Sequence, residues 1–434
     1  MSAVNPDNKI GVLIFPAGEI NSVELHDALS TCVNIRLFGA SSVERHGEFV
    51  FRNYISGVPM ITDPQFVDMF NSILEANDID VVIPTHDDVA LFLAQKQELI
   101  KAKILTSDIK TAEICRDKLA TFELFADCKF CPAVYDSFSQ LPLFIKPRKG
   151  QGGKDAKVVR SSSDIPPEGS LNDYVICEYL PGAELTVDCF TDKDGELQVI
   201  FPRTRQRVFA GVSVRSQNEP LTDEIRNIAT TINSRLRFLG LWYFQIKQDN
   251  SGNYKLLEIS VRCAGTMCLP RASGINLPLL SVYAALGHKT EVLRNDCDIV
   301  VDRTLISRYK TSIDYQRVYI DLDDTIIING KANLHAIRFL YQCINEGRHI
   351  SLITRHGSDH ADSVREALQT VKIMPELFDE IIEIDAGTAK CSAIKPYKAI
   401  FIDNAYAERK AVYDNLKIPV FDVDGIEALL DWRT

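Results

Sequence analysis

The sequence predicts a multidomain chain that combines α/β and α+β architecture, and three observations lead to this prediction. The chain has 434 residues, which is more than one ordinary hydrophobic core accommodates, so two or three domains are expected. Short β-branched runs alternate with helical patterns in the first part of the chain and again after residue 317. Between these regions short strands follow one another through polar turns, as in an antiparallel sheet.

Residues 1–107 predict an α/β domain with a parallel sheet, because strand and helix patterns alternate there. In the second helix, apolar residues recur at helical spacing from Phe66 to Leu74. No GxGxxG sequence is present, so a dinucleotide-binding fold is not expected. The expected strands are residues 10–15, 34–38 and 80–84, and the expected helices are residues 22–30, 64–76 and 87–101.

Residues 108–301 have a different pattern, which predicts an α+β domain with a largely antiparallel sheet. The sequence Asp192-Lys193-Asp194-Gly195 supplies one hairpin turn, and residues 249–252 supply another. The expected strands are residues 143–147, 156–160, 174–178, 185–190, 197–201, 242–248 and 254–259.

Residues 302–316 are predicted to be a polar connector, and the strand–helix alternation returns in residues 317–434. This alternation predicts a second α/β domain with a sheet covered by helices. The expected strands are residues 318–322, 349–354, 399–403 and 420–423, and the expected helices are residues 333–346 and 359–370.

The composition is that of a globular protein without a surface for nucleic acid or membranes. Hydrophobic residues make up 46% of the chain, and the net charge is −11. An excess of acidic groups repels phosphate backbones and anionic lipids, so neither is expected as a partner. No apolar stretch approaches the ~18 residues that span a bilayer, and the short run before Pro16 is interpreted as a core strand, not a signal peptide. The 11 cysteines are interpreted as scattered free thiols, and the predicted location is the cytoplasm.

A glycine-rich, basic loop separates two of the expected central strands. Residues 145–154 read IKPRKGQGGK, which places Gly150, Gly152 and Gly153 among lysines. Glycine lets backbone N–H groups approach phosphate oxygens, and lysine neutralises their charge. The sequence GxxxxGK[ST] is absent, so the loop is not a P-loop. Taken alone, it predicts a phosphate-binding loop or a solvated basic turn equally well.

Oxygen-bearing side chains on later strands favour the phosphate-binding interpretation. Gln245 and Glu258 lie on the two expected strands of one hairpin, where their oxygen atoms suit a Mg²⁺ ion that bridges ATP phosphates. With Lys146, the glycine loop and residues 177–184, they form an ordered set that resembles the ATP-grasp superfamily. The resemblance is strongest to the ATP-binding halves of the carbamoyl phosphate synthetase large subunit and to amino-acid ligases.

The resemblance covers about residues 9–287, and residues 1–107 resemble the α/β domain that precedes the ATP-grasp fold in this superfamily. It implies ATP and Mg²⁺, or Mn²⁺, as cofactors. The implied nucleotide-binding residues are Lys118, Lys146, Gly150, Gly152 and Gly153, the adenine hinge Glu178, Tyr179 and Leu180, and the ribose-binding Glu184. The implied metal ligands are Gln245, Glu258 and Ser260, with Ser260 in place of the usual Asn, and Arg262 is implied next to the transferred phosphoryl group.

Three arginines alternate along the chain just after the strand at residues 197–201. Because alternate residues of a strand point to one face, Arg203, Arg205 and Arg207 are predicted to project together. Arg205 is the preferred candidate for holding a substrate carboxylate or the phosphoryl group, since guanidinium binds oxyanions through two parallel hydrogen bonds. A solvated basic strand edge is the alternative.

Near the C-terminus, a series of polar residues occurs at the ends of expected strands. Asp321 lies at the end of the expected strand at residues 318–322, Asp323 lies just beyond it, and Thr354, Lys390 and Asp403 follow in order. An acidic turn is the alternative for the first pair alone. The whole series resembles the haloacid dehalogenase-like phosphohydrolases over about residues 317–432.

That second resemblance implies a Rossmannoid domain in which an aspartyl phosphate forms. Asp321 is the implied nucleophile, Asp323 the general acid/base, and Thr354 a contact of the phosphoryl group. Lys390, with Lys395 as the second choice, is implied to stabilise charge there. Asp403 is implied to bind Mg²⁺ together with Asp321 and Asp323, while Asn404 stands where a second acid is frequent. The segment before residue 333 is too short for a large cap domain.

Together the two resemblances imply a bifunctional enzyme. One half is an ADP-forming, Mg-ATP-dependent carboxylate–amine ligase with an acyl-phosphate intermediate, and the other is a phosphatase. The alternative is a phosphatase whose ATP-grasp half only binds nucleotide as a sensor or scaffold, which Ser260 favours. The expected partners are a small-molecule carboxylate, an amine and a phosphorylated small molecule. The oligomeric state is open, and a homo-oligomer is compatible with the sequence.

Overall fold

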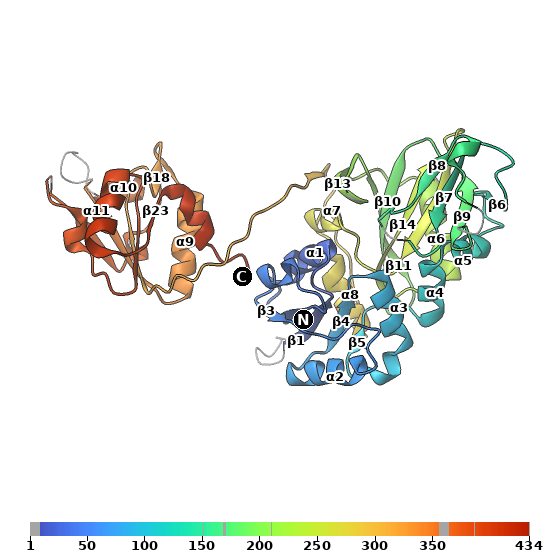
Figure 1. Ribbon diagram of the computed structural model, residues 1–434, viewed down its shortest axis with the longest axis horizontal. Helices are drawn as coiled ribbons and strands as arrows, with labels where there is room; N and C mark the ends of the chain where they lie inside the picture. The colour runs from blue at the N-terminus through green and yellow to red at the C-terminus, as the bar shows by residue number, and fades with distance from the viewer. Residues whose placement is uncertain are drawn as a thin grey trace. The chain divides into compact units, whose positions relative to one another are not determined.

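The computed structural model describes residues 9–150, 152–167, 171–209, 211–355, 364–385 and 387–433. The chain divides into two compact units, Met1–Leu305 and Ile306–Thr434, and each is described by itself (Figure 1). Residues 359–363 of the last predicted helix, and Gln151 of the glycine loop, lie outside the described residues.

The first unit begins with a five-stranded parallel sheet in the order β3-β2-β1-β4-β5. Its central strand is apolar throughout, and Val12, Leu13 and Ile14 are fully buried. The strand order reverses between β1 and β4, so the carboxyl ends of these two strands lie at a switch point of the sheet, where α/β domains commonly bind ligands. The strands are β1 (Ile10–Phe15), β2 (Ile35–Ala40), β3 (Asn53–Ile55), β4 (Val81–Pro84) and β5 (Lys103–Ile104), and the helices are α1 (Ile20–Leu29), α2 (Phe66–Ala76) and α3 (Asp87–Gln95).

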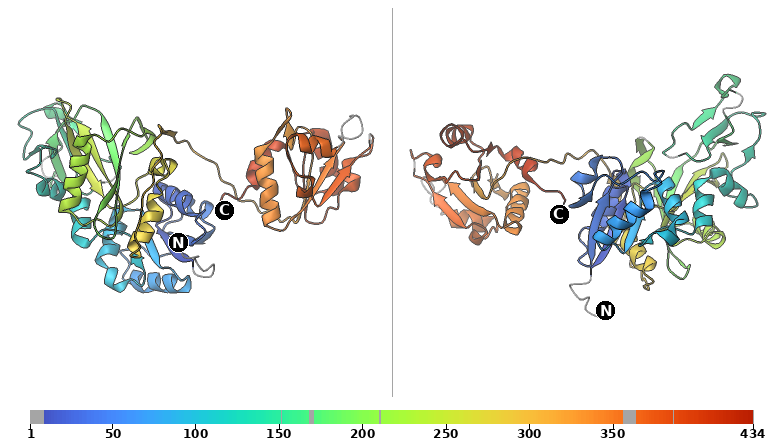
Figure 2. Two further views of the ribbon diagram at one scale, coloured as in Figure 1. Left: turned by 180° about the vertical axis from the view of Figure 1, so that it is seen from behind. Right: turned by 60° about the horizontal axis from the view of Figure 1, so that its bottom comes forward.

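Two antiparallel four-stranded sheets follow, with the orders β6-β9-β7-β8 and β11-β10-β14-β15 (Figure 2). The helices α4 (Ile109–Arg116) and α5 (Lys118–Leu124) lead into the first of them. Helix α6 (Asp223–Arg235) buries Ile225, Ile228 and Ile232 in a core that also contains Trp242 of the second sheet. The strands are β6 (Val134–Tyr135), β7 (Leu143–Pro147), β8 (Lys157–Val159), β9 (Tyr174–Glu178), β10 (Glu184–Thr191), β11 (Leu197–Thr204), β14 (Gly240–Gln248) and β15 (Tyr254–Ser260).

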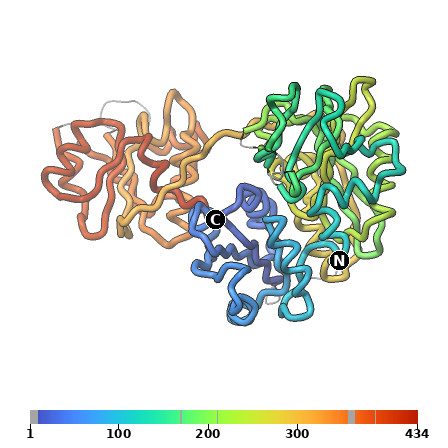
Figure 3. Tube along the Cα trace, turned by 45° about the vertical axis from the view of Figure 1, so that its right-hand side comes forward, coloured from blue at the N-terminus to red at the C-terminus, as the bar shows by residue number. Residues whose placement is uncertain are grey.

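A small three-stranded sheet, β12-β13-β16, completes the first unit, and its last strand is the end of the unit's regular structure. Its strands are β12 (Arg207–Phe209), β13 (Val212–Gln217) and β16 (Val300–Asp302), and the helices α7 (Cys268–Ala272) and α8 (Leu277–Ala285) precede the last of them. The tube in Figure 3 follows the chain through these sheets.

The second unit is built on a five-stranded parallel sheet in the order β21-β20-β17-β22-β23. Its central strand, β17, is flanked on both sides, and Val318 and Ile320 are fully buried. The strands are β17 (Arg317–Ile320), β20 (His349–Thr354), β21 (Glu380–Glu383), β22 (Ala399–Ile402) and β23 (Val420–Phe421), and the helices are α9 (Leu334–Asn345), α10 (Val364–Thr370) and α11 (Tyr406–Leu416). Between β17 and α9 the chain forms only the small hairpin of β18 (Ile327–Ile328) and β19 (Lys331–Ala332).

The mixed α/β prediction is confirmed, and several details differ from it. The helix predicted at 87–101 is interrupted, because α3 ends at Gln95 and a 3₁₀ turn follows at Gln97–Leu99. The strand predicted at 318–322 ends at Ile320, so Asp321 begins the loop after it. The described cysteines are all unpaired thiols, as predicted, yet they are not all scattered, since Cys128 and Cys131 form a Cys-x-x-Cys turn. Among the described residues, no helix has the length and apolar character required to cross a membrane.

Candidate nucleotide pocket and aspartate site

A pocket of about 540 Å³ lies in the first unit and is lined by both antiparallel four-stranded sheets. Its volume is in the range typical of small-molecule sites. Gly150, Gly152 and Gly153 of the basic loop contribute to its wall, so the structure places the loop at a pocket, as the phosphate-binding interpretation requires. Gly152 and Gly153 have positive φ values of 64° and 70°, which glycine adopts without steric cost.

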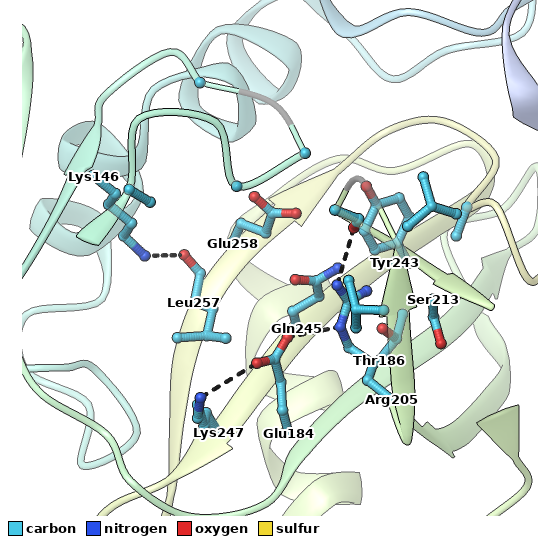
Figure 4. Close-up of a pocket in the computed structure, with 18 of the residues that line it drawn as sticks. Lys146, Glu184, Thr186, Arg205, Ser213, Tyr243, Gln245, Lys247, Leu257 and Glu258 are labelled. Atoms are coloured by element: carbon cyan, nitrogen blue, oxygen red, sulfur yellow. Dashed lines mark hydrogen bonds and ion pairs between the residues drawn. The ribbon is translucent and has the colours of Figure 1, made fainter. Parts of the chain in front are cut away.

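A row of polar side chains crosses the floor of this pocket. The strand register sets Glu258 of β15 opposite Gln245 of β14, Gln245 opposite Thr186 of β10, and Thr186 opposite Arg203 of β11. Facing partners in antiparallel strands have side chains on the same face of the sheet, so all four point into the pocket. Figure 4 shows Gln245 and Glu258 projecting from neighbouring strands on the same side. Amide and carboxylate oxygens are ligands that suit Mg²⁺, and this pair is two of the three metal ligands implied for the pocket.

Two lysines lie at the end of the pocket near Glu258. Lys146 is buried, and its Nζ donates to the carbonyl of Leu257 at 2.7 Å and lies 4.8 Å from the centre of the Phe122 ring. Burial lowers the pKa of Lys146, because the charged ammonium group loses hydration at this position. Lys118 Nζ lies 3.6 Å from Glu258 Oε2 and donates to the Gly150 carbonyl. The two predicted phosphate-binding lysines are therefore brought together with the glycine loop and the carboxylate.

The segment predicted to bind adenine and ribose also lines the pocket. Glu178 accepts a hydrogen bond from the backbone N–H of Ala133 at 2.9 Å, which fixes its side chain. Tyr179 and Leu180 line the pocket beside it. Glu184 forms an ion pair with Arg205 at 2.7 Å and another with Lys247 at 3.5 Å (Figure 4). Lys247 was not among the predicted site residues.

The prediction that three arginines share one strand face is wrong. Strand β11 ends at Thr204, and Arg207 belongs to β12 of a different sheet, where it pairs with Asp302 at 2.6 Å. Arg203 is buried and held by Asp188 at 2.6 Å and by the hydroxyl of Thr266. Arg205 alone of the three combines a position on the pocket wall with an ion pair to another pocket residue.

The last two predicted residues of the pocket are connected to a side chain that the sequence did not suggest. Ser260 Oγ donates to Asp87 Oδ1 at 2.8 Å, and Arg262 Nη2 donates to Asp87 Oδ2 at 2.9 Å. Arg262 lines the pocket, whereas Ser260 is 6% exposed and is directed to Asp87. The hydroxyl of Ser260 is thus engaged by a carboxylate, and its role as a metal ligand stays a prediction.

Thr186 is a further pocket residue that pattern reasoning missed. It is 1% exposed, and within the described part of the chain its hydroxyl has no hydrogen-bond partner. A strand threonine is common in any buried sheet, so only its register opposite Gln245 marks it as a site residue.

In the second unit, three predicted residues meet at the carboxyl ends of β17 and β22. Lys390 Nζ lies 2.6 Å from Asp321 Oδ1 and 2.7 Å from Asp403 Oδ2, and all three side chains are buried. Burial raises the pKa of the Asp321 carboxyl, Lys390 opposes this rise, and Asp403 adds to it. Burial would lower the pKa of Lys390, but the two carboxylates outweigh it and raise that pKa. Lys390, and not Lys395, is therefore the lysine of this cluster.

Two further residues predicted for this site lie at or just beyond the carboxyl ends of β20 and β17. Thr354 is fully buried at the end of β20, the neighbour of β17, whereas Asp323 lies in the exposed turn after Asp321. In the described ranges, no group of three His, Cys, Asp or Glu side chains has a metal-binding arrangement, and the metal-binding role of Asp321, Asp323 and Asp403 stays a prediction. Glu408, near Asn404 in the sequence, accepts a hydrogen bond from Arg355 Nη2 at 2.8 Å.

Comparison with known protein families indicates the class of the first unit. The family model described as "ATP-grasp in the biosynthetic pathway with Ter operon" matches residues 170–304. Carbamoyl-phosphate synthase from Methanobrevibacter smithii is 24% identical over 142 residues, which are 29% of this chain and 39% of that enzyme. The chain thus matches well under half of the length of its curated relative.

Solved structures agree on the fold. The biotin carboxylase domain of 2-oxoglutarate carboxylase from Hydrogenobacter thermophilus, solved with MgADP and bicarbonate, has a TM-score of 0.52 and 15% identity over 65% of this chain and 71% of that one. The L-amino acid ligase from Bacillus licheniformis has a TM-score of 0.51 and 16% identity over 64% of this chain and 74% of that one. The chain therefore has a mixed α/β fold that is ATP-grasp-like over about 65% of its length, and residues 170–304 match an ATP-grasp family model.

Proposed function

We propose that the first unit is an ADP-forming ligase that uses Mg-ATP, or Mn-ATP, to phosphorylate a small carboxylate and then joins the acyl group to an amine. The observation that carries the proposal is the arrangement of Lys118, Lys146 and Glu258 beside the glycine loop of one pocket. The amino-acid ligase and carboxylase neighbours, and the carbamoyl-phosphate synthase relative, support the same reaction class. We also propose the division into an N-terminal domain of residues 1–107 and an ATP-grasp domain of residues 108–301.

In this proposal different pocket residues bind different parts of the nucleotide. The backbone at Glu178, Tyr179 and Leu180 would bind adenine, and Glu184, which pairs with Arg205 and Lys247 in the structure, would bind the ribose hydroxyls. The glycine loop and the two lysines neutralise the phosphates, which is the main requirement of phosphoryl transfer. Gln245 and Glu258 would hold the metal ion, whose charge offsets that of the β- and γ-phosphates. Arg262, and Arg205 when it is released from Glu184, would bind the oxyanions of the acceptor.

The product nucleotide tests this proposal. Because the charged groups gather around the phosphate end of the pocket, we expect attack on the γ-phosphorus, with release of ADP and, after the amine has reacted, of inorganic phosphate. Wild-type protein is incubated with Mg-ATP and a panel of carboxylates and amines, and nucleotides are separated by chromatography. AMP with pyrophosphate as the products would exclude an acyl-phosphate route.

We further propose that residues 317–434 form a phosphatase of the aspartyl-phosphate type, connected through residues 302–316. The buried cluster of Asp321, Lys390 and Asp403 supports this proposal, since a nucleophilic carboxylate requires a nearby cation to approach a phosphate dianion. Asp321 would attack phosphorus, Asp323 would protonate the leaving oxygen, and Thr354 would contact the phosphoryl oxygens. Asp321 and Asp403 supply hard oxygen atoms that suit Mg²⁺.

A second candidate function follows from Ser260. Its hydroxyl donates to Asp87 and not toward Gln245 and Glu258, which leaves those two as the metal ligands of the pocket. A weaker metal site would favour nucleotide binding without turnover, so that the phosphatase would be the sole catalyst. Binding of Mg-ATP measured by calorimetry, together with no ADP formation on the full substrate panel, would select this candidate.

A further inference from the structure

Asp87 is an acidic residue that no step of the proposed reaction uses. It is the first residue of α3 and follows β4 at the switch point of the N-terminal sheet. Its side chain is 17% exposed, and that of Arg262 is 11% exposed. The carboxylate contacts residues far along the chain on and beyond β15, so it links the N-terminal sheet to the floor of the nucleotide pocket.

Both oxygen atoms of this carboxylate are engaged. Oδ1 accepts from the hydroxyl of Ser260 at 2.8 Å, and Oδ2 accepts from Nη2 of Arg262 at 2.9 Å. Burial would raise the pKa of Asp87, but the charge of Arg262 and the two hydrogen bonds outweigh burial and lower it. The pair is therefore fully charged at neutral pH.

The guanidinium of Arg262 is confined on its other sides as well. Nη1 donates to the carbonyl of Cys263 at 3.1 Å, and the group lies 5.7 Å from the centre of the Tyr243 ring. In the described part of the chain Nε has no partner. Arg262 lines the pocket, and its hydrogen bonds to Asp87 and to the Cys263 carbonyl fix the direction of its guanidinium group. An arginine held in this way requires little reordering when a developing negative charge appears beside it.

We propose that Asp87 is a positioning residue that holds Arg262 in its orientation at the reactive end of the pocket, and that Ser260 tethers Asp87. This inference rests on the proposed ligase function. It gives the N-terminal domain a part in the reaction, because the β4–α3 turn supplies the carboxylate that orients an arginine of the ATP-grasp sheet. It also accounts for a serine at position 260, where a hydroxyl is short enough to donate to Asp87.

A double-mutant cycle tests whether Asp87 acts through Arg262. The variants are Asp87→Asn, Arg262→Ala, and the two together, each in the full-length chain. Asn keeps the shape of Asp and removes its charge, so the fold should be retained. The matched control is Asp88→Asn, which removes the neighbouring carboxylate of the same helix turn, where Asp88 is half exposed and pairs with Arg116. Turnover of Mg-ATP to ADP, the Kd for Mg-ADP and the melting temperature are measured for each.

The expected result is a loss of turnover without a loss of nucleotide binding. Asp87→Asn should form ADP about tenfold more slowly than the wild type, with the Kd for Mg-ADP and the melting temperature little changed. Combined with Arg262→Ala, it should have no further effect on turnover. Ser260→Ala, which removes one tether and leaves the ion pair, should show a smaller loss in the same direction.

Failure of the positioning role and failure of the ligase function would give different results. If the wild type forms ADP and Asp87→Asn forms it at the same rate, or if its effect simply multiplies with that of Arg262→Ala, the positioning role is excluded and the ligase function stands. If the wild type itself forms no ADP on the substrate panel, the ligase function is overturned, and with it this inference.

Discussion

Lys146 is a buried lysine at the pocket, and that environment makes its removal informative. Replacing Lys146 by Ala should lower ADP formation by about 100-fold or more, which is the usual effect of losing one charged group that stabilises a transition state. Glu258→Ala should act similarly through the metal ion. Nucleotide chromatography measures the rate, and circular dichroism confirms that the fold is retained.

Lys149→Ala is the matched control for this change. Lys149 belongs to the same basic loop but is exposed and does not line the pocket. We expect its turnover to stay within about twofold of the wild type, since an exposed charge is well screened by water. Equal losses of ADP formation in the two variants would show that activity depends on the total charge of the loop and not on Lys146 itself. Wild-type activity in Lys146→Ala would exclude Lys146 from the site.

For individual residues, the sequence predicts the position of a side chain where that position follows from a local pattern. Gln245 and Glu258 lie on two strands of one hairpin, so a short turn and alternation place them face to face. The partnership of Ser260 with Asp87 joins residues 173 positions apart, and no local pattern reports it. The prediction for Arg207 is wrong because strand β11 ends at Thr204, a boundary that alternation alone does not reveal.

Among the elements, the contact between the glycine loop and the turn before β13 is the most constrained. Gly211 has a φ of 77°, and a Cβ at this position would collide with the carbonyl group of Gly152. Gly211→Ala should therefore displace the loop that lines the phosphate end of the pocket. We expect a Kd for Mg-ADP about tenfold higher, equivalent to about 1.4 kcal/mol, measured by calorimetry.

The control separates backbone strain from the collision. Gly195, in the turn between β10 and β11, has a φ of 86° with open space around its Cβ position. Gly195→Ala should cost about 1–2 kcal/mol of folding free energy, as alanine does in this backbone region, and leave the Kd unchanged. A Kd in Gly211→Ala equal to that of Gly195→Ala would show that the contact with Gly152 does not govern the loop.

Elements with strong periodicity are predictable, and short ones are not. β1 and β20 have the predicted bounds, and in each strand the sheet buries every residue after the first. β5 and β18 have two residues each, too few to show a period. Their strand geometry is set by neighbouring strands and not by their own sequence.

For the whole molecule, the two units predict where the chain can be divided. β16 ends at Asp302, which pairs with Arg207, and Tyr315 is 6% exposed in the core of the second unit. A cut between Leu305 and Ile306 therefore spares both cores. Each fragment should stay in solution and unfold in one cooperative step, as measured by circular dichroism during heating. Aggregation of both fragments would mean that a shared core had been cut.

The two proposed active sites make a prediction that only the full chain can test. Asp321→Asn should abolish hydrolysis of a generic phosphomonoester, because an amide cannot form the aspartyl phosphate. Asp324→Asn is the control, since Asp324 lies in the same turn, is exposed, and has a φ of 53° that Asn tolerates well. Both variants should still consume ATP when the ligase substrates are present.

The joining of the two units in one chain suggests that the phosphatase acts on the product of the ligase or on a precursor that feeds it. If it acts on the product, Asp321→Asn accumulates a phosphorylated compound visible by mass spectrometry, and Lys146→Ala forms none. If it acts on a precursor, the phosphorylated compound persists in Asp321→Asn and no ligase product appears until the dephosphorylated substrate is added. Loss of ATP consumption in Asp321→Asn despite that addition would mean that the two sites are coupled, and retained phosphatase activity would remove Asp321 as the nucleophile.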